Sequence, residues 1–253
     1  MNTVLITGST SGFGKACAEL FASHGWRLIL CGRRQERLDT LSADLTGAPV
    51  HVAAFDVRDN RMVMKMYADI PEEFKKIDVL VNSAGLALGM HPAQGADLAD
   101  WETMVDTNIK GLMYMTRVVL PGMVELGQGH IVNLGSVAGN WPYPGGNAYG
   151  GTKAFVRQFS LNLRADLHGT GVRVTNIEPG LAETEFSVVR FHGDKDRADS
   201  VYAGMTPLTA ADIAETIYWV ASRPSHVNIN AIEIMPVAQS WGPFPIHRQE
   251  KKK

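Results

Sequence analysis

The sequence has few of the residues from which disulfide-rich and metal-binding proteins are built. It contains two cysteines, Cys17 and Cys31, whereas a structural zinc site needs about four ligands at short spacing and a disulfide framework needs several pairs. The eight histidines are scattered without the spacing of metal ligands. We therefore expect both cysteines to be buried as small apolar side chains, and we predict no metal site.

Long apolar runs and an excess of one charge are also missing. No apolar stretch approaches the roughly 18 residues of a membrane span, and the opening residues MNTVLITGS have no basic region or cleavage site. The 24 Lys and Arg residues against 26 Asp and Glu leave a net charge of −2, which gives no overall attraction to nucleic acid or to an anionic membrane. These absences predict a cytoplasmic protein that binds neither.

The chain shows a regular alternation of short β-branched runs with longer amphipathic stretches. With 45% hydrophobic and 20% charged residues, its 253 residues can bury a large core, and we expect one domain over residues 1–253. The predicted strands are Thr3–Thr7, Arg27–Cys31, Val50–Val57, Ile77–Asn82, Gly129–Ser136, Gly171–Ile177 and Ala231–Met235. The predicted helices are Gly12–His24, Gln35–Leu45, Asn60–Asp69, Asp100–Leu126, Tyr149–Leu167 and Ala211–Ala221.

This alternation predicts an α/β fold with a doubly wound, parallel, seven-stranded sheet of the Rossmann type and helices on both faces. Strands that are apolar throughout, such as IDVLVN, suit a sheet covered on both sides. The irregular stretch from Pro179 to Thr209 follows the carboxyl end of a strand, where open α/β sheets bind ligands. We therefore expect a substrate lid over about residues 180–209, and a C-terminal tail over residues 237–253.

A glycine-rich segment, TGSTSGFG, joins the first predicted strand to the first predicted helix. Its glycines allow a tight turn and a close approach of the backbone to a pyrophosphate at the helix N-terminus. They would also suit an ordinary strand-to-helix turn. Their place in a β-α-β unit favours dinucleotide binding. The candidate cofactor residues of this loop are Gly8, Ser9, Thr10, Ser11, Gly12, Phe13 and Gly14.

The end of the second predicted strand indicates which dinucleotide is bound. NAD enzymes usually carry an acidic residue there to accept from the ribose hydroxyls, whereas this chain has Arg33 and Arg34. Two guanidinium groups can pair with a 2′-phosphate, so the sequence predicts NADPH or NADP+ as the cofactor. The alternative is that both arginines only begin a solvated helix.

The next two strands end in further candidate cofactor residues. Asp56, followed by Val57, can accept a hydrogen bond from the adenine amino group. After the fourth strand, the segment that begins at Asn82 contains Ala84 and Gly85, whose small size lets the backbone lie against the nucleoside. Either segment would also serve as an ordinary strand-terminal turn.

Four polar residues predict acid and base chemistry. Tyr149 and Lys153 are four residues apart in a predicted helix and therefore share a face. A free phenol has a pKa near ~10, so we expect the positive charges of Lys153 and an oxidised nicotinamide to lower it toward neutrality. Ser136 supplies a hydroxyl for the substrate carbonyl oxygen, and Asn108 is expected to hold a water that relays protons from Lys153. Each is also a common cap or turn residue, but their joint position favours catalysis.

Taken in order, these motifs resemble the short-chain dehydrogenase/reductase family over essentially the whole chain. The resemblance rests on TGSTSGFG, NSAG, Asn108, Ser136, Tyr149-x-x-x-Lys153 and Glu178-Pro179-Gly180. It implies a Ser-Tyr-Lys-Asn tetrad, hydride transfer with NAD(P)H and commonly a homotetramer. It also implies cofactor contacts at Tyr149, Lys153, Pro179, Gly180, Leu181 and Thr184. The family more often has NNAG where this chain has NSAG, but the first asparagine is retained.

Narrower resemblances concern the substrate. GNAYGGTKAFVRQF and IEPGLAETEF resemble bacterial NADP-dependent 3-hydroxy acid dehydrogenases that oxidise L-serine and L-allo-threonine, whereas EFSVVRFHGDKDRADSVY and QSWGPFPIHR resemble sulfoacetaldehyde reductases. The main expectation is NADPH-dependent reduction of a short anionic aldehyde, sulfoacetaldehyde to isethionate. The alternative is a 3-hydroxy acid dehydrogenase acting on L-serine, L-allo-threonine or the pair 3-hydroxypropionate and malonate semialdehyde. A non-catalytic nucleotide-sensing protein is a remoter alternative, which the intact tetrad disfavours.

Both substrate classes carry an anion, which needs a charge-assisted partner once it leaves water. Arg190, in the otherwise apolar VVRF of the lid, is the first candidate. Tyr143 and Asn147, in the loop before Tyr149, are expected to donate to the same anion, and Arg248 of the tail to reach a site in its own or a neighbouring subunit. Alternatively, Tyr143 only shapes a rigid loop, Arg190 forms a surface salt bridge and Arg248 is solvated.

Overall fold

The strands within residues 1–241, the part of the chain that this computed structural model describes, form one parallel sheet. They are β1 (Thr3–Thr7), β2 (Arg27–Gly32), β3 (Val50–Ala54), β4 (Val79–Asn82), β5 (Gly129–Leu134), β6 (Val172–Pro179) and β7 (Ala231–Ile234). Their spatial order is β3-β2-β1-β4-β5-β6-β7, and every neighbouring pair is parallel. The chain therefore reverses its winding direction between β1 and β4, where open α/β sheets form their ligand crevice. The predicted doubly wound fold is confirmed.

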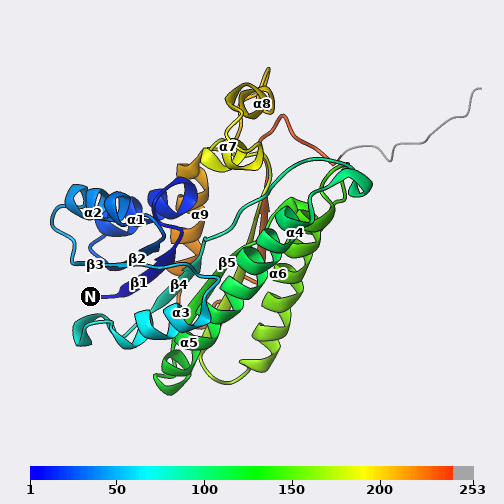
Figure 1. Cartoon of the computed structure of the whole chain (residues 1–253). Coiled ribbons are helices and arrows are strands. Elements are labelled where there is room, and N and C mark those ends of the chain that lie inside the picture. The colour runs from blue at the N-terminus through cyan, green and yellow to red at the C-terminus, as the bar shows by residue number, and fades with distance from the viewer. Residues whose placement is uncertain (242–253) are drawn as a thin grey trace, which may run out of the picture.

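Helices cover both faces of this sheet (Figure 1). The longer ones are α1 (Gly12–Ser23), α2 (Gln35–Asp44), α3 (Asn60–Ala68), α4 (Leu98–Val105), α5 (Leu112–Glu125), α6 (Asn147–Asp166) and α9 (Ala210–Ala221). On one face α1 and α2 lie with α9, which packs against α1. On the other face α3 packs against α5, and α4 packs against α6. No helix within residues 1–241 is both long and apolar enough to cross a membrane.

Two apolar cores, one on each side of the sheet, explain the strands that are apolar throughout. Leu28 and Leu30 of β2 point into the core under α1 and α9, whereas Ile29 between them points into the core under α3 and α5. Successive strand residues face opposite sides, so both sets must be apolar when both sides are covered. Cys17 and Cys31 are free thiols buried in these cores, as expected, and burial raises the pKa of each.

The predicted continuous helix over Asp100–Leu126 is wrong in its middle. Residues Asp106–Gly111 form a π-helical segment between α4 and α5. Gly111 in this segment approaches the loop after β3 closely, because a Cβ there would lie 2.7 Å from a methyl carbon of Val57. Such π segments insert an extra residue into a helical turn and often occur at functional sites. The candidate residue Asn108 lies in this segment.

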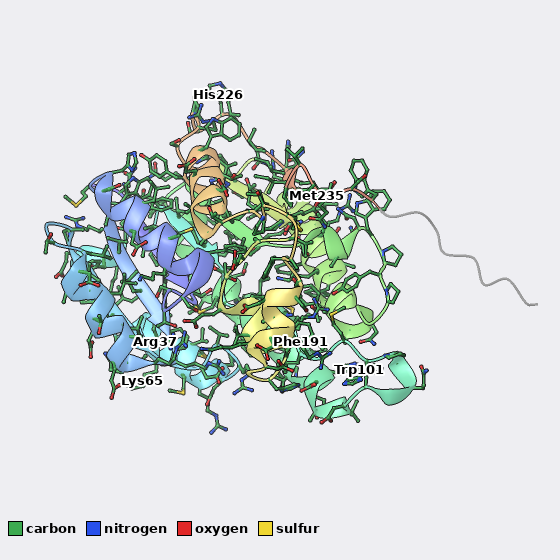
Figure 2. The ribbon with its side chains drawn as sticks, turned by 90° about the horizontal axis from the view of Figure 1, so that it is seen from above. Arg37, Lys65, Trp101, Phe191, His226 and Met235 are labelled. Atoms are coloured by element: carbon green, nitrogen blue, oxygen red, sulfur yellow. The ribbon has the colours of Figure 1, made fainter. Side chains whose placement is uncertain are left out.

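The lid segment, residues 180–209, is not irregular throughout as predicted. It contains two short helices, α7 (Glu185–Arg190) and α8 (Lys195–Ser200). Each begins after a side-chain cap: Thr184 accepts from the backbone N–H of Phe186, and Asp194 from that of Arg197. Both helices extend from one edge of the sheet in Figure 1, and Figure 2 looks down on that side, with Phe191 and Met235 labelled.

Candidate active site

The described residues line two adjoining cavities at the carboxyl edge of the sheet. The glycine-loop cavity is lined by Gly8, Thr10, Ser11, Gly12, Phe13, Arg33, Arg34, Asp56, Val57, Ala84, Gly85 and Thr184. The tyrosine cavity is lined by Phe13, Gly85, Ser136, Tyr143, Tyr149, Lys153, Pro179, Gly180, Leu181, Thr184 and Arg190. Three candidate residues are common to both, so the cavities share a wall. Most of the predicted site residues are thus brought together.

Glycine is required at the floor of the first cavity. Gly8 and Gly12 have φ values of +68° and +51°, in the left-handed region that side chains with a Cβ disfavour. A Cβ on Gly8 would lie 2.9 Å from the Cα of Ala84, and one on Gly14 would overlap the carbonyl oxygen of Gly8. The loop therefore packs directly against the end of β4 and leaves bare backbone at the start of α1, which suits a bound pyrophosphate.

Arg34 lies over this glycine loop. Its guanidinium donates to the hydroxyl of Thr10 at 2.7 Å and to that of Ser11 at 3.2 Å. Arg33 lines the same cavity, as the prediction of a phosphate site requires. The sequence did not reveal Glu185, which starts α7, lines this cavity and pairs with Arg34 at 3.4 Å. These two residues are 151 positions apart, and no local pattern links them.

Asp56 keeps a charged acceptor in the first cavity. Partial burial raises the pKa of its carboxyl, but hydrogen bonds from Arg58 and the charge of that residue outweigh burial, and the net pKa lies below its usual value. The Nη2 of Arg58 is 2.6 Å from Oδ2 of Asp56. Val57 lies beside it in the cavity wall. Both candidates therefore line the cavity, and the adenine contact stays a prediction.

Ser9 and Asn82 line neither cavity, and their contact with a cofactor stays a prediction. Ser9 is fully buried, and its hydroxyl donates to the carbonyl oxygen of Cys31 at 3.1 Å. The amide of Asn82 donates to Oδ1 of Asn133 at 2.9 Å and to the hydroxyl of Thr116 at 3.1 Å. Ser9 thus links the glycine loop to β2, and Asn82 links β4 to β5 and α5.

Ser136 and Tyr149 meet in the tyrosine cavity. Ser136 follows β5, where its hydroxyl accepts from the N–H of Ala138 at 3.1 Å and donates to the carbonyl oxygen of Pro179 at 3.3 Å. Tyr149 lies in the first turn of α6 and lines the same cavity as Ser136. A carbonyl oxygen between these two hydroxyls would therefore meet two potential donors.

The environment of Tyr149 in the protein alone raises its pKa, and the lowering expected from Lys153 together with an oxidised nicotinamide stays a prediction. Burial raises the pKa to about 12, and the nearby hydroxyl of Ser136 and the charge of Arg190 only partly oppose this. The phenol therefore keeps its proton at neutral pH in the protein alone. Lys153, which was expected to lower this pKa, instead donates from Nζ to the carbonyl oxygen of Leu134 at 2.7 Å. Tyr-x-x-x-Lys spacing carries no information about either effect.

Lys153 and Asn108 lie together behind Gly85. Burial lowers the pKa of Lys153 to about 8, and the residue is 6% exposed. Asn108 donates to the carbonyl oxygen of Leu86 at 2.8 Å and to the hydroxyl of Thr152 at 3.0 Å, and it accepts from the N–H of Leu86 at 2.9 Å. Both amide hydrogens are therefore engaged. The proposed water relay at Asn108 stays a prediction.

Arg190 brings a positive charge to the tyrosine cavity. It donates to the hydroxyl of Tyr143 at 2.7 Å and to the carbonyl oxygen of Gly89 at 3.3 Å. Its guanidinium carbon is 5.4 Å and 5.6 Å from the ring centres of Tyr143 and Tyr149. No acidic side chain within residues 1–241 forms an ion pair with it. Arg190 is thus a partly buried cation with neutral partners, beside the reactive phenol.

The other two candidates for the anion site, Asn147 and Arg248, are not found in the tyrosine cavity among the described residues. Asn147 does not line the tyrosine cavity; its amide donates to the carbonyl oxygen of His91 at 3.1 Å, and it faces a small separate hollow with Trp101. Its amide is thus engaged with the backbone outside the tyrosine cavity, and its contact with the substrate anion stays a prediction. Arg248 lies outside the described residues.

These observations agree with the comparisons with known proteins. The family pattern described as short chain dehydrogenase matches residues 2–194. The chain belongs to the short-chain dehydrogenase family. It is therefore an oxidoreductase, and the resemblance seen in its motifs is confirmed.

Relatives in this family are similar to the chain over nearly its whole length. The NADP-dependent 3-hydroxy acid dehydrogenase of Escherichia coli K12 is 57% identical over 97% of this chain and 99% of its own length. The serine 3-dehydrogenase of Rhizobium radiobacter is 56% identical, covering 98% of each chain. The sulfoacetaldehyde reductase 2 of Chromohalobacter salexigens is also 56% identical, over 97% of this chain and 98% of its own.

Solved structures agree at the level of the whole fold. The closed form of a serine dehydrogenase complexed with NADP+ matches with a TM-score of 0.96 and 57% identity, covering 98% of this chain and 100% of the other. A serine dehydrogenase from Escherichia coli matches with a TM-score of 0.84 and 54% identity, covering 94% and 100%.

The segment after β7 contributes residues that the motifs did not reveal. Oε1 of Gln239 accepts from the N–H of Leu181 at 2.8 Å and lies against Gly180, where a Cβ would overlap it. The ring centres of Trp241 and Trp141 are 5.5 Å apart, and both rings line the tyrosine cavity. Nothing in the sequence singled out Gln239.

Proposed function

We propose that the protein is an NADP(H)-dependent dehydrogenase that interconverts the alcohol and carbonyl forms of a short 3-hydroxy acid, such as L-serine, L-allo-threonine or 3-hydroxypropionate. The proposal depends on one observation: the charge of Arg190 lies beside Tyr149, and its hydrogen-bond partners among the described residues are all neutral. A carboxylate bound there would place a hydroxyl two carbons away within reach of the phenol. The 3-hydroxy acid and serine dehydrogenases among the relatives support this substrate class more than the reductase expected first.

The glycine-loop cavity suits the proposed cofactor. Gly8 and Gly12 leave backbone room for a pyrophosphate, and Gly14 lets α1 pack closely against Gly8. Arg33 and Arg34 provide cations for a 2′-phosphate. Bound NADP(H) would supply or accept the hydride.

The phosphate site is tested with the single variants Arg33→Ala and Arg34→Ala. We expect each to raise the dissociation constant of NADPH far more than that of NADH, because only NADPH carries the 2′-phosphate that pairs with a guanidinium. An unchanged preference between the two cofactors in both variants would show that these arginines only begin a solvated helix.

Within the tyrosine cavity we assign the proton to Tyr149. Its raised pKa keeps the phenol protonated at neutral pH, ready to donate to a carbonyl oxygen. Ser136 would orient that oxygen, and Lys153, held by the carbonyl of Leu134, would support the ribose side of the cofactor. Asn108 would maintain the wall at Leu86 that separates these groups from solvent.

The acid assignment is tested with Tyr149→Phe. We expect this variant to lose turnover while its affinity for NADPH, measured by the change in protein fluorescence, remains close to that of the wild type. Near-normal turnover would show that another group moves the proton.

The anion site is tested with Arg190→Ala. We expect KM for L-serine to rise far more than KM for a short alcohol without a charge, because only the charged substrate loses an ion pair. Arg223→Ala is the matched control, since Arg223 lies over Trp219 and lines neither cavity. Equal effects of Arg190→Ala on both substrates would exclude the proposed anion site.

Reduction of sulfoacetaldehyde to isethionate is the second candidate. It is favoured by the 56% identity to the sulfoacetaldehyde reductase, and a sulfonate can accept from Arg190 as a carboxylate does. Comparing kcat/KM for sulfoacetaldehyde and malonate semialdehyde decides between them. A hundredfold preference for the sulfonate, equivalent to about 2.7 kcal/mol, would favour the isethionate-forming enzyme, and comparable or reversed values would favour the 3-hydroxy acid dehydrogenase.

We also propose that the enzyme is a cytoplasmic homotetramer. Large apolar side chains exposed on the subunit, including Leu98, Val105 and Trp219, are consistent with surfaces that are covered on assembly. Light scattering at several protein concentrations tests the assembly. A persistent monomer would exclude it.

A further inference from the structure

Glu185 occupies a position that the proposed reaction does not explain. It is the first residue of the lid helix α7, yet its carboxylate lies against arginines that follow β2. It pairs with Nη1 of Arg37 at 2.9 Å and with Nη1 of Arg34 at 3.4 Å. Figure 2 labels Arg37 on α2, seen from the side on which the lid lies. A negative charge from the lid is thus held by Arg37 and by Arg34, of which Arg34 lines the glycine-loop cavity.

Of these two arginines, Arg34 also belongs to the proposed site for a 2′-phosphate, together with Arg33. Arg34 donates to Thr10 and Ser11, so its guanidinium is directed toward the glycine loop. Glu185 lines this cavity too. A phosphate that approaches Arg34 must therefore either share this guanidinium with the carboxylate or displace it. Because both groups are anions, sharing carries a repulsion that a cofactor without the phosphate would not meet.

We propose that Glu185 is a counter-ion that competes with the 2′-phosphate of NADP(H) for Arg34 and thereby limits the affinity for the phosphorylated cofactor. The inference rests on the proposed NADP(H) dependence. The side chain of Glu185 is 50% exposed, so it can move away, and Arg37 offers it an alternative partner. Competition of this kind weakens phosphate binding without preventing it.

The expected effect on affinity follows from the repulsion between two negative charges, Glu185 and the 2′-phosphate, that lie close together near the surface. Replacing Glu185 by Gln removes the charge and keeps the shape, so a ligand with a 2′-phosphate should bind about threefold to tenfold more tightly at low ionic strength. Salt screens exposed charges, so this gain should shrink as ionic strength rises. A ligand without the 2′-phosphate should bind equally well to both proteins.

The experiment measures the dissociation constants of adenosine 2′,5′-bisphosphate and adenosine 5′-monophosphate by calorimetry, so that no turnover is involved. The proteins are the wild type, Glu185→Gln and the matched control Glu183→Gln. Glu183 is an exposed acid of the same loop that lines neither cavity and forms no ion pair with an arginine among the described residues. We expect tightening only for the bisphosphate and only in Glu185→Gln.

Each other outcome overturns the inference. Unchanged or weaker bisphosphate binding in Glu185→Gln would show that Glu185 does not compete, and equal tightening in Glu183→Gln would show only an effect of net charge. If the wild type does not distinguish the two ligands, the arginine site in the proposed function fails and the inference fails with it. Thr184 still caps α7 in the variant, and circular dichroism verifies that its fold is unchanged.

Discussion

Lys153→Met provides a quantitative test of how burial acts in the site. The side chain of Lys153 is enclosed at the start of α6 with the carbonyl oxygen of Leu134 as its hydrogen-bond partner. Burial lowers its pKa from 10.5 to about 8. Because one pKa unit corresponds to about 1.4 kcal/mol, holding the ammonium in this place at neutral pH costs about 3 kcal/mol relative to water. Methionine has a similar shape and carries no such cost.

The pH dependence of the free energy of unfolding separates this cost from the other effects of the substitution. Between pH 8 and 10.5 the folded Lys153 has lost its proton while the unfolded one keeps it. The unfolded state then binds more protons, so the free energy of unfolding of the wild type rises with pH. Between pH 7 and 9 the wild type should gain about 1.4 kcal/mol relative to Lys153→Met, although the variant is expected to lose turnover.

Urea unfolding of both proteins at pH 7, 8 and 9 measures this difference. All other titrating groups are common to the two proteins and cancel. Lys110→Met is the control. The hydrogen bond and charge of Asp106 raise the pKa of Lys110, so this lysine stays protonated in both the folded and the unfolded protein over this pH range. A stability difference between the wild type and Lys153→Met that stays constant from pH 7 to 9 would refute the lowered pKa and the reasoning from burial.

Three further predictions follow from the same geometry. Gly14→Ala should lower the melting temperature and the affinity for NADPH, because the added Cβ has no space. Gly151→Ala should be tolerated, because no atom lies within 4 Å of its added Cβ. Equal effects of the two substitutions would contradict this reasoning. Burial lowers the pKa of His130 to about 3, so between pH 6 and 4 only the unfolded state binds a proton at this residue. As the pH falls over this range, the wild type should lose about 1.4 kcal/mol of unfolding free energy per pH unit relative to His130→Gln. Urea unfolding of both proteins measures this loss. With an uncharged alcohol, Arg190→Ala should shift the pH profile of oxidation upward, since the charge of Arg190 lowers the pKa of Tyr149; an unmoved profile would count against that coupling.

The fold was predictable from the sequence because its signals are local. Short continuous apolar runs indicate the strands of a sheet that is covered on both faces, and the longer amphipathic stretches between them indicate the helices. The π-helical segment at Asp106–Gly111 was not predictable, because its residues continue the helical pattern on both sides and no local signal marks it. The caps at Thr184 and Asp194 were present in the sequence and could have indicated α7 and α8.

The site was predictable to the extent that its residues occur at the ends of strands or at helical spacing. Parallel strands bring their carboxyl ends to one edge, so the glycine loop, Ser136 and the Tyr149 helix had to meet. Glu185 and Gln239 reach the site through tertiary contacts that leave no local pattern. The raised pKa of Tyr149 likewise depends on enclosure, which only the packed structure shows.

Arg190 links substrate binding to the proton on Tyr149. Its positive charge acts against burial and lowers the pKa of the phenol. A carboxylate or sulfonate bound to Arg190 would offset that charge and move the pKa of Tyr149 upward again. Under the proposed function, an anionic aldehyde would therefore strengthen the hold of Tyr149 on its proton until hydride transfer creates the alkoxide that takes it. The neutral partners of Arg190, the hydroxyl of Tyr143 and the carbonyl of Gly89, are what leave its charge available for this coupling.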